Sequence, residues 1–184
     1  MTPQPTAQAY IPADDEKLNS VMIYTPQKLI WGQLISKKAV RVSTWMQMGM
    51  APTYMCMTDT QTMIFGAGQS TKTLKSSILH IQTRQIIAYH LLPPSSEAPY
   101  YDINEPNRKM APATAFVGGF RFDCTIRMAQ QSKLDIFLGV AKGDFLPIFD
   151  VLMSCPVMPS LKGIRAPFAL VRQEAAMFTQ SGYS

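Results

Sequence analysis

The stretch that decides the fold is WGQLISKKAVRVSTWM, at positions 31–46. Its apolar residues alternate from Leu34 to Val42, which is typical of a half-buried strand, and the alternation stops at Ser43. A Ser hydroxyl accepts hydrogen bonds from the first free N–H groups of a helix. Ser43 is therefore predicted to be the N-cap of a short helical turn that Gly49 ends.

A second stretch, CTIRMAQQSKLDIFLG at positions 124–139, follows the same order with few of the same letters. Leu134 corresponds to Val42, and Asp135 falls on the position of Ser43. Because Asp is as good an N-cap as Ser, a second capped turn is predicted there.

Further matches extend this similarity along the chain. The strands TYMCMTD and DFLPIFD follow the two turns and are predicted to end at Asp59 and Asp150. Near the ends of the two blocks, RQIIAYH (84–90) aligns with RQEAAMF (172–178). The sequence therefore predicts one β-rich unit that occurs twice.

The spacing of short strands and turns in each block favours a small barrel or sandwich. The expected fold class is mainly β: two tandem small β-barrel or sandwich modules, each with a short helical turn. The predicted division is a flexible N-terminal lead (1–17), a first module (18–92), a proline-rich linker (93–113), a second module (114–180) and a tail (181–184). Such thin modules are expected to pack on each other or on a second chain.

The stretches RVSTWM…APTYMCMTD and KLDIFL…FLPIFD resemble a group of largely uncharacterised small bacterial β domains, related to Sm-like and SH3-like barrels. The resemblance covers about two thirds of the chain. It implies a fold and a tendency to assemble, and it carries over no catalytic residue. The segment QTRQII lacks the glycine of the second Sm motif, which puts an Sm-type uridine site in doubt.

Composition excludes several classes of protein. Hydrophobic residues make up 47% of the 184 residues and charged residues 16%, as in globular rather than disordered chains. No apolar run is long enough for a membrane span, and the N-terminus lacks the apolar core of a signal peptide. The three widely spaced cysteines fit reduced thiols, so a cytoplasmic location is expected.

Positive charge is concentrated in the first block. Residues 17–92 carry eight Lys and Arg against the single acid Asp59, a net charge of +7, whereas residues 113–180 carry seven against five, a net charge of +2. Such a field attracts polyanions. The candidate polyanion-binding residues are Lys37, Lys38, Arg41, Lys72, Lys75 and Arg84.

Two interpretations of these basic residues remain open. With the nearby aromatic residues Trp31, Trp45 and Tyr54, they would suit single-stranded RNA or DNA, which binds through cations and stacking. Alternatively, lysines on edge strands prevent aggregation, and the aromatic residues occupy core-like positions.

Catalytic and metal-site motifs are weak. The stretch IFGAGQSTKT (64–73) has Thr71 where a phosphate loop has glycine, and a strand-like segment follows it. His80 and His90 lack further ligands at metal-site spacing, and a Cys56–His80 nucleophilic pair would require that the two meet in space. No cofactor and no metal are expected.

The expected function is therefore that of a non-catalytic interaction or assembly module. Its partner is expected to be a second copy of the chain, in a homo-oligomer, or another protein. The alternative is binding of nucleic acid or another polyanion through the first module.

Overall fold

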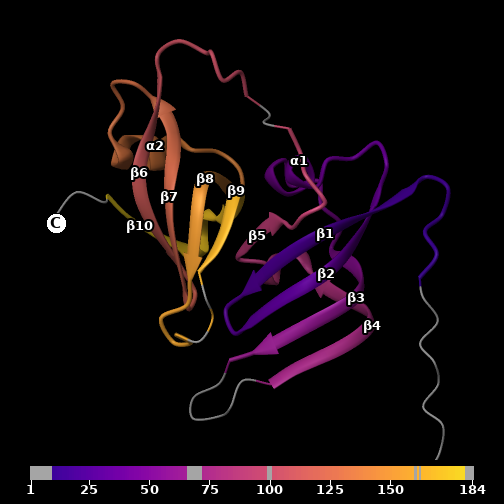
Figure 1. Cartoon of the computed structure of the whole chain (residues 1–184). Coiled ribbons are helices and arrows are strands. Elements are labelled where there is room, and N and C mark those ends of the chain that lie inside the picture. Colours follow the sequence, from indigo (N-terminus) through magenta and orange to yellow (C-terminus); the bar gives the residue numbers. More distant parts are fainter. Residues whose placement is uncertain (1–9, 66–71, 99–100, 160, 162, 181–184) are drawn as a thin grey trace, which may run out of the picture.

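The computed structural model describes residues 10–65, 72–98, 101–159, 161 and 163–180, and the arrangement is drawn in Figure 1. Within these residues, ten strands and two short α-helices follow one another. They are β1 (Glu16–Thr25), β2 (Lys28–Lys37), α1 (Val42–Gln47), β3 (Tyr54–Ile64), β4 (Lys72–Gln82), β5 (Ala88–Leu91), β6 (Arg108–Val117), β7 (Phe120–Ala129), α2 (Leu134–Val140), β8 (Phe145–Ser154), β9 (Ile164–Arg172) and β10 (Ala176–Thr179). Short 3-10 helices, η1 (Thr83–Gln85) and η2 (Gln173–Ala175), precede β5 and β10.

The described strands form one continuous antiparallel sheet in the order β10-β6-β7-β8-β9-β5-β1-β2-β3-β4. The predicted mainly β class is confirmed. The sheet is open, since within the described residues β10 and β4 each have a partner strand on one side only. These two edge strands lie on opposite sides of the molecule (Figure 1).

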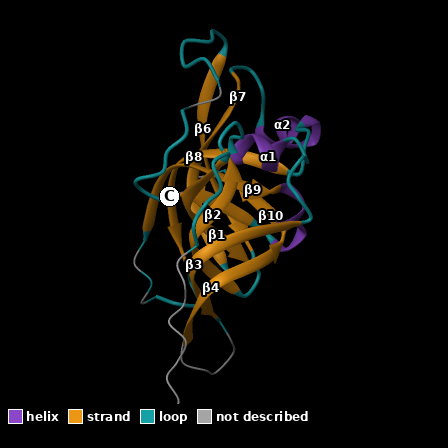
Figure 2. Ribbon diagram, turned by 90° about the vertical axis from the view of Figure 1, so that its right-hand side faces the viewer, coloured by secondary structure: helices purple, strands orange, loops and turns teal. Residues whose placement is uncertain are grey.

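The elements repeat in order. We call β1–β5 with α1 the first module and β6–β10 with α2 the second module. In both, the fifth strand pairs with the first, and the first four strands pair in succession. Val42 and Leu134 begin the two helices, 92 residues apart, as the sequence comparison predicts. Figures 1 and 2 show both helices near the same end of the molecule.

The predicted helix caps are wrong. The N-cap residues are Arg41 and Lys133, so Ser43 and Asp135 lie inside the first turns. Neither N-cap residue makes a side-chain capping bond. The first turn of α1 is capped from far away in sequence, because the backbone N–H groups of Val42 and Ser43 donate to the carboxylate of Glu97 at 2.8 and 3.3 Å.

The predicted strand ends at two aspartates are also wrong, since β3 continues to Ile64 and β8 to Ser154. Asp59 and Asp150 instead adopt a left-handed φ of 51° in the middle of these strands. Pairing with the neighbouring strand shifts at the same places, as expected of β-bulges. Two bulges at matching positions support the repeat more strongly than the letters do.

Residues Arg108–Ala113, which lie in the segment expected to be linker, form the first part of β6. Pro112 is tolerated in this strand because β10 pairs only with Thr114–Val117. At Pro112 the strand therefore has a partner on one side only among the described residues, and a missing N–H costs no ladder bond on the other.

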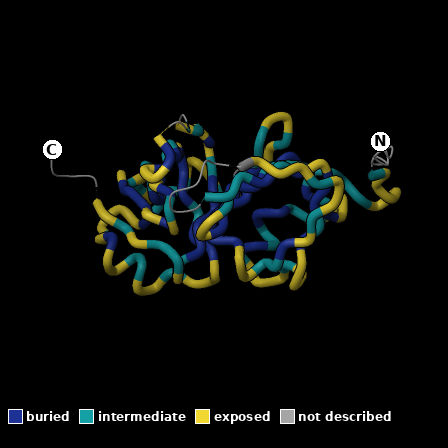
Figure 3. The backbone as a smooth tube through the Cα atoms, turned by 90° about the horizontal axis from the view of Figure 1, so that it is seen from below, coloured by how far each residue is buried: buried dark blue, intermediate teal, exposed yellow. Residues whose placement is uncertain are grey.

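The two modules share their hydrophobic interiors. Strand β1 is buried on both faces from Asn19 to Thr25. Val21 and Ile23 pack into the core of the first module, whereas Met22 and Tyr24 pack into the larger core of the second. Figure 3, coloured by burial, shows buried backbone running through the centre of the molecule.

Candidate functional site

The joint between the modules is the pairing of β5 with β9, which we call the inner joint. Ala88 lies opposite Val171, and Tyr89 lies opposite Leu170. All four residues are buried. The fifth strand of one module thus pairs with the fourth strand of the other.

Arg172, at the end of β9, reinforces the inner joint. Its backbone N–H donates to the carbonyl of Ile87 at 2.8 Å, and its Nε and Nη2 donate to the carbonyls of Ile86 (2.8 Å) and Thr83 (2.9 Å). The guanidinium lies 4.5 Å from the ring centre of Phe145, with the side chain only 8% exposed. The two side-chain bonds are charge-assisted, because the guanidinium carries a full positive charge, and this makes the contact a strong one.

The two open edges of the sheet, which we call the outer edges, are β4 and β10. Strand β4 occupies the place in the first module that β9 occupies in the second, and β10 matches β5 in the same way. The outer edges are therefore the equivalents of the two strands that pair at the inner joint.

Strand register fixes this equivalence residue by residue. Gln82 pairs with the first residue of β3, and Arg172 pairs with the first residue of β8, so Gln82 is the equivalent of Arg172. Ala88 pairs with Tyr24, and Met177 pairs with Phe116. Strands β1 and β6 begin 92 residues apart, so Tyr24 on β1 is the equivalent of Phe116 on β6. Their partners Ala88 and Met177 are therefore equivalent as well.

The alignment of RQIIAYH with RQEAAMF that the sequence suggested is therefore wrong. In the structure, η1 begins at Thr83 and η2 at Gln173, 90 residues apart, so Arg84 corresponds to Glu174. From Ala88 and Met177 onward the interval is 89, which leaves Ile86 as an extra residue of the first module. Ile86 supplies one of the two carbonyls to which the Arg172 side chain donates.

Five of the six predicted polyanion-binding residues lie in two regions, and Arg84 lies apart on η1. Lys37, Lys38 and Arg41 surround the connection from β2 to α1. Lys72 and Lys75 lie on β4 at the end that pairs with Ile64 and Gln61, which is the opposite end of the strands. About ten residues of strand, on the order of 30 Å, separate the two regions.

Carboxylates already accompany part of the first group. Lys37 Nζ lies 2.8 Å from Asp15 and 3.6 Å from Glu16. Arg41 donates to the carbonyl of Ala98 and lies 4.0 Å from Glu97. Arg84, the remaining member, is exposed on η1 and donates to Gln82 at 2.8 Å. Binding of a polyanion stays a prediction.

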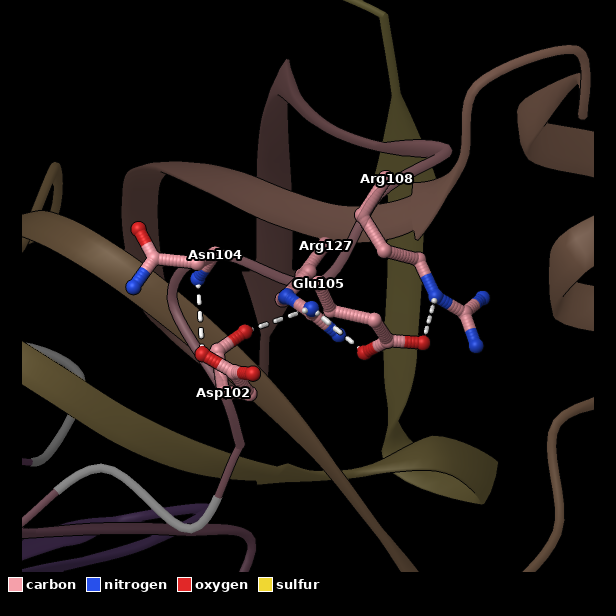
Figure 4. A network of polar contacts seen from close by, with 5 residues as sticks. All are labelled: Asp102, Asn104, Glu105, Arg108 and Arg127. Atoms are coloured by element: carbon pink, nitrogen blue, oxygen red, sulfur yellow. Dashed lines mark hydrogen bonds and ion pairs between the residues drawn. The ribbon is translucent and has the colours of Figure 1, made fainter.

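The connection between the modules is fixed at both ends. Glu97 caps α1 and also accepts a hydrogen bond from the Ser43 hydroxyl. Farther along, Arg127 on β7 donates to the Glu105 carboxylate at 2.6 Å and to the Asp102 carbonyl at 3.1 Å (Figure 4). Arg108 binds the same carboxylate at 2.9 Å. These charge-assisted bonds hold the described part of the connection against both modules.

The structure brings the Cys56–His80 pair together, since the two residues lie directly opposite each other on β3 and β4. Desolvation, assisted by the nearby charge of Glu16, raises the pKa of the Cys56 thiol. A nucleophilic cysteine requires the opposite shift, because the thiolate is the reactive form. The pair therefore has the proximity but lacks the activation that catalysis needs.

The remaining cysteine and loop positions give no described reactive group. Burial raises the pKa of Cys124 to about 12. Of the stretch IFGAGQSTKT, which the sequence indicated to be a poor match to a phosphate loop, residues 66–71 lie outside the described residues, and the segment that follows is the strand β4, as expected. Within the described ranges, no group of three or more His, Cys, Asp or Glu is placed to hold a metal ion.

The chain matches no family model, and neither a curated protein nor a solved structure is significantly similar to it. A helix long and apolar enough to cross a membrane does not occur in the described part of the chain. The outer edges are the candidate functional surface, because their strands are equivalent to the two strands that pair at the inner joint.

Proposed function

We propose that this protein is a self-associating, non-catalytic module, in which β10 of one copy pairs with β4 of the next copy as β5 pairs with β9 inside each chain. The observation that carries the proposal is that the strands left open at the outer edges are the equivalents of those joined at the inner joint. Each copy has one edge of each kind, so the contact is head-to-tail. Contacts of this type produce a closed ring or an open chain of copies.

The surface of the outer edges supports the proposal. An open edge presents unpaired N–H and C=O groups to any incoming strand, and proteins usually protect it with charge. The part of β4 from Ser76 to Gln82 has no Lys, Arg, Asp or Glu, and β10 has none either. Apolar side chains are exposed there instead: Ile78 is 51% exposed and Met177 is 70% exposed.

The inner joint supplies the register for the proposed contact. Val171 and Leu170 are the equivalents of Ile81 and His80, because β9 and β4 are aligned by their pairing with β8 and β3. Met177 of one copy is therefore expected opposite Ile81 of the next. Phe178 is expected opposite His80.

Cysteine crosslinking tests this register. In a Cys56→Ser background, which removes the native thiol beside position 80, the double variant His80→Cys/Phe178→Cys should form covalent dimers and longer ladders on mild oxidation. Directly opposite residues on antiparallel strands come close enough for a disulfide. Each single variant is the matched control, because a head-to-tail contact never brings two copies of the same position together.

Two outcomes would contradict the proposal. Light scattering that shows only a single chain of about 20 kDa at high concentration would exclude self-association. Equal crosslinking of either single variant would indicate a symmetric contact in place of the head-to-tail one.

A further inference from the structure

At the inner joint, an aromatic side chain of the first module is inserted into the second. Tyr24 is 0% exposed, and its ring centre lies 4.9 Å from that of Phe120 and 5.3 Å from that of Phe122, both in edge-to-face geometry. Met22 and Ala88 enter the same core beside it. The core of the second module is thus completed by residues from the first.

The first module has a cavity at the matching place. Its volume is about 290 Å³. Lys28 and Ile30, which are the equivalents of Phe120 and Phe122, contribute to its wall. The lining residues are Thr25, Lys28, Ile30, Thr62, Ile64, Leu74, Ser76, Leu79, His80, Ile81 and Gln85.

In the second module, the equivalents of three of these lining residues are buried in the core. Thr62, Ile64 and Ser76 correspond by register to Met153, Cys155 and Ala166, all buried in the core that receives Tyr24. The cavity in the first module is therefore the position that Tyr24 and its neighbours fill in the second module.

The residue that matches Tyr24 is exposed at the other end of the molecule. Phe116 on β6 is 36% exposed, and Met177 on β10, directly opposite it, is 70% exposed. Together they form an apolar pair at the outer edge that would dock in the proposed assembly.

We infer that Phe116 of one copy inserts into the first-module cavity of the next copy, with Met177 beside it, as Tyr24 inserts into the second module within the chain. This inference rests on the proposed head-to-tail assembly and names its anchor. The wall of the cavity combines aliphatic side chains, such as Ile30 and Ile64, with polar ones. Its volume of about 290 Å³ exceeds the roughly 150 Å³ that accepts a benzene ring, so it has room for the ring of Phe116 and part of Met177. Lys28 replaces Phe120 in the wall, and its ammonium would meet the ring face in a cation–π contact.

The test compares self-association of the full chain with that of three variants by sedimentation at several concentrations. Phe116→Ala removes the anchor, and Thr62→Met fills the cavity with the side chain that the second module carries at the same place. Each should weaken association by about tenfold or more, as truncation of a buried aromatic anchor does. Ile136→Ala is the matched control, since Ile136 is an exposed apolar residue on α2, 57% exposed, and should leave association unchanged.

The outcomes separate the two proposals. If wild type associates and neither Phe116→Ala nor Thr62→Met weakens it, the insertion is excluded while the head-to-tail assembly stands. If wild type remains monomeric at every concentration, the assembly is excluded and the insertion with it. A loss of association in Ile136→Ala equal to that in Phe116→Ala would also exclude a specific anchor.

Discussion

The inner joint and the outer edges are built from equivalent strands and differ in how completely they are closed. At the inner joint, Ala88, Tyr89, Leu170 and Val171 are all buried. At the outer edges, Met177, the equivalent of Ala88, is largely exposed. Equivalent strands are thus paired with each other at the inner joint and lack this pairing at the outer edges.

Two local differences distinguish the inner joint from the outer edges. Arg172 has no counterpart on β4, where Gln82 stands and donates to Tyr54 within its own module at 2.6 Å. Ile86, whose carbonyl accepts from Arg172, has no counterpart before β10. The inner joint therefore has charge-assisted bonds that an intermolecular joint would lack, so contacts between copies should be weaker than the contact within the chain.

The largest effect is expected from Arg172→Met. The change removes two charge-assisted bonds and leaves the carbonyls of Ile86 and Thr83 without these donors, which should lower the free energy of unfolding by roughly 3 kcal/mol. Urea unfolding followed by fluorescence measures it. Gln82→Met is the matched control at the equivalent outer position and should stay within about 0.5 kcal/mol. Similar losses in the two variants would refute the distinction between the joints.

A smaller loss is expected from Gly118→Ala in the β6–β7 turn. Gly118 has a left-handed φ of 59°, and an added Cβ would lie 2.7 Å from Cδ1 of Ile87, at the inner joint. Strain of this kind costs roughly 1–2 kcal/mol in unfolding experiments. Gly119→Ala is the control, because its Cβ would have only an ordinary contact with Val157 at 3.7 Å. A Gly119→Ala variant as unstable as Gly118→Ala would contradict this account.

The inner joint should also make stability dependent on pH. His90 on β5 is buried, with Nδ1 donating to the Leu91 carbonyl at 2.9 Å and Nε2 2.9 Å from the Tyr24 hydroxyl. Desolvation lowers the pKa of His90 below its usual value, although the bond to Leu91 opposes the shift. The unfolded chain therefore binds a proton at a higher pH than the folded chain does. Stability should fall as the pH drops below about 6.5.

Urea unfolding at about pH 7.5 and about pH 5.5 should show a loss on the order of 1 kcal/mol in wild type. His90→Asn should flatten this dependence. His80→Asn, on the outer edge, should preserve it. An unchanged slope in His90→Asn would show that another group is responsible.

The smallest effect is expected when the outer edge receives the arginine of the inner joint. Gln82→Arg supplies β4 with the residue that β9 carries at the equivalent position. With one of the two acceptor carbonyls missing, association should tighten by about three- to tenfold, corresponding to one charge-assisted bond, as measured by sedimentation. Gln82→Lys is the control, because lysine has the charge without the planar fork. Equal tightening by Lys would indicate a general effect of charge.

The repeat and both helices could be predicted from the sequence, because apolar alternation and its interruption are local signals. The interval of 92 residues between Val42 and Leu134 is visible in the letters alone. The misplaced caps had a different cause. Glu97 caps α1 from 55 residues away, and a local sequence pattern cannot indicate so distant a capping residue.

The pairing across the inner joint could not be predicted for the same physical reason. It depends on β5 and β9, which are more than 70 residues apart in sequence and are joined by only two register pairs. The displaced alignment near the C-terminus follows from the extra Ile86, which strand register reveals and letter matching hides. One signal was available: the last strand, β10 (Ala176–Thr179), contains no charged residue, which is unusual for a strand at the edge of a sheet.

Strand β1 gives one face to each of the two cores, and this arrangement has a consequence for the melting of the molecule. If either core loosens, β1 loses the contacts on the face that packs there, and the strand's packing in the other core is weakened as well. Heating should therefore produce a single calorimetric peak whose van't Hoff enthalpy equals its total enthalpy, as for one cooperative unit of the whole chain. The two modules repeat the same order of elements, yet they should unfold together in a single transition.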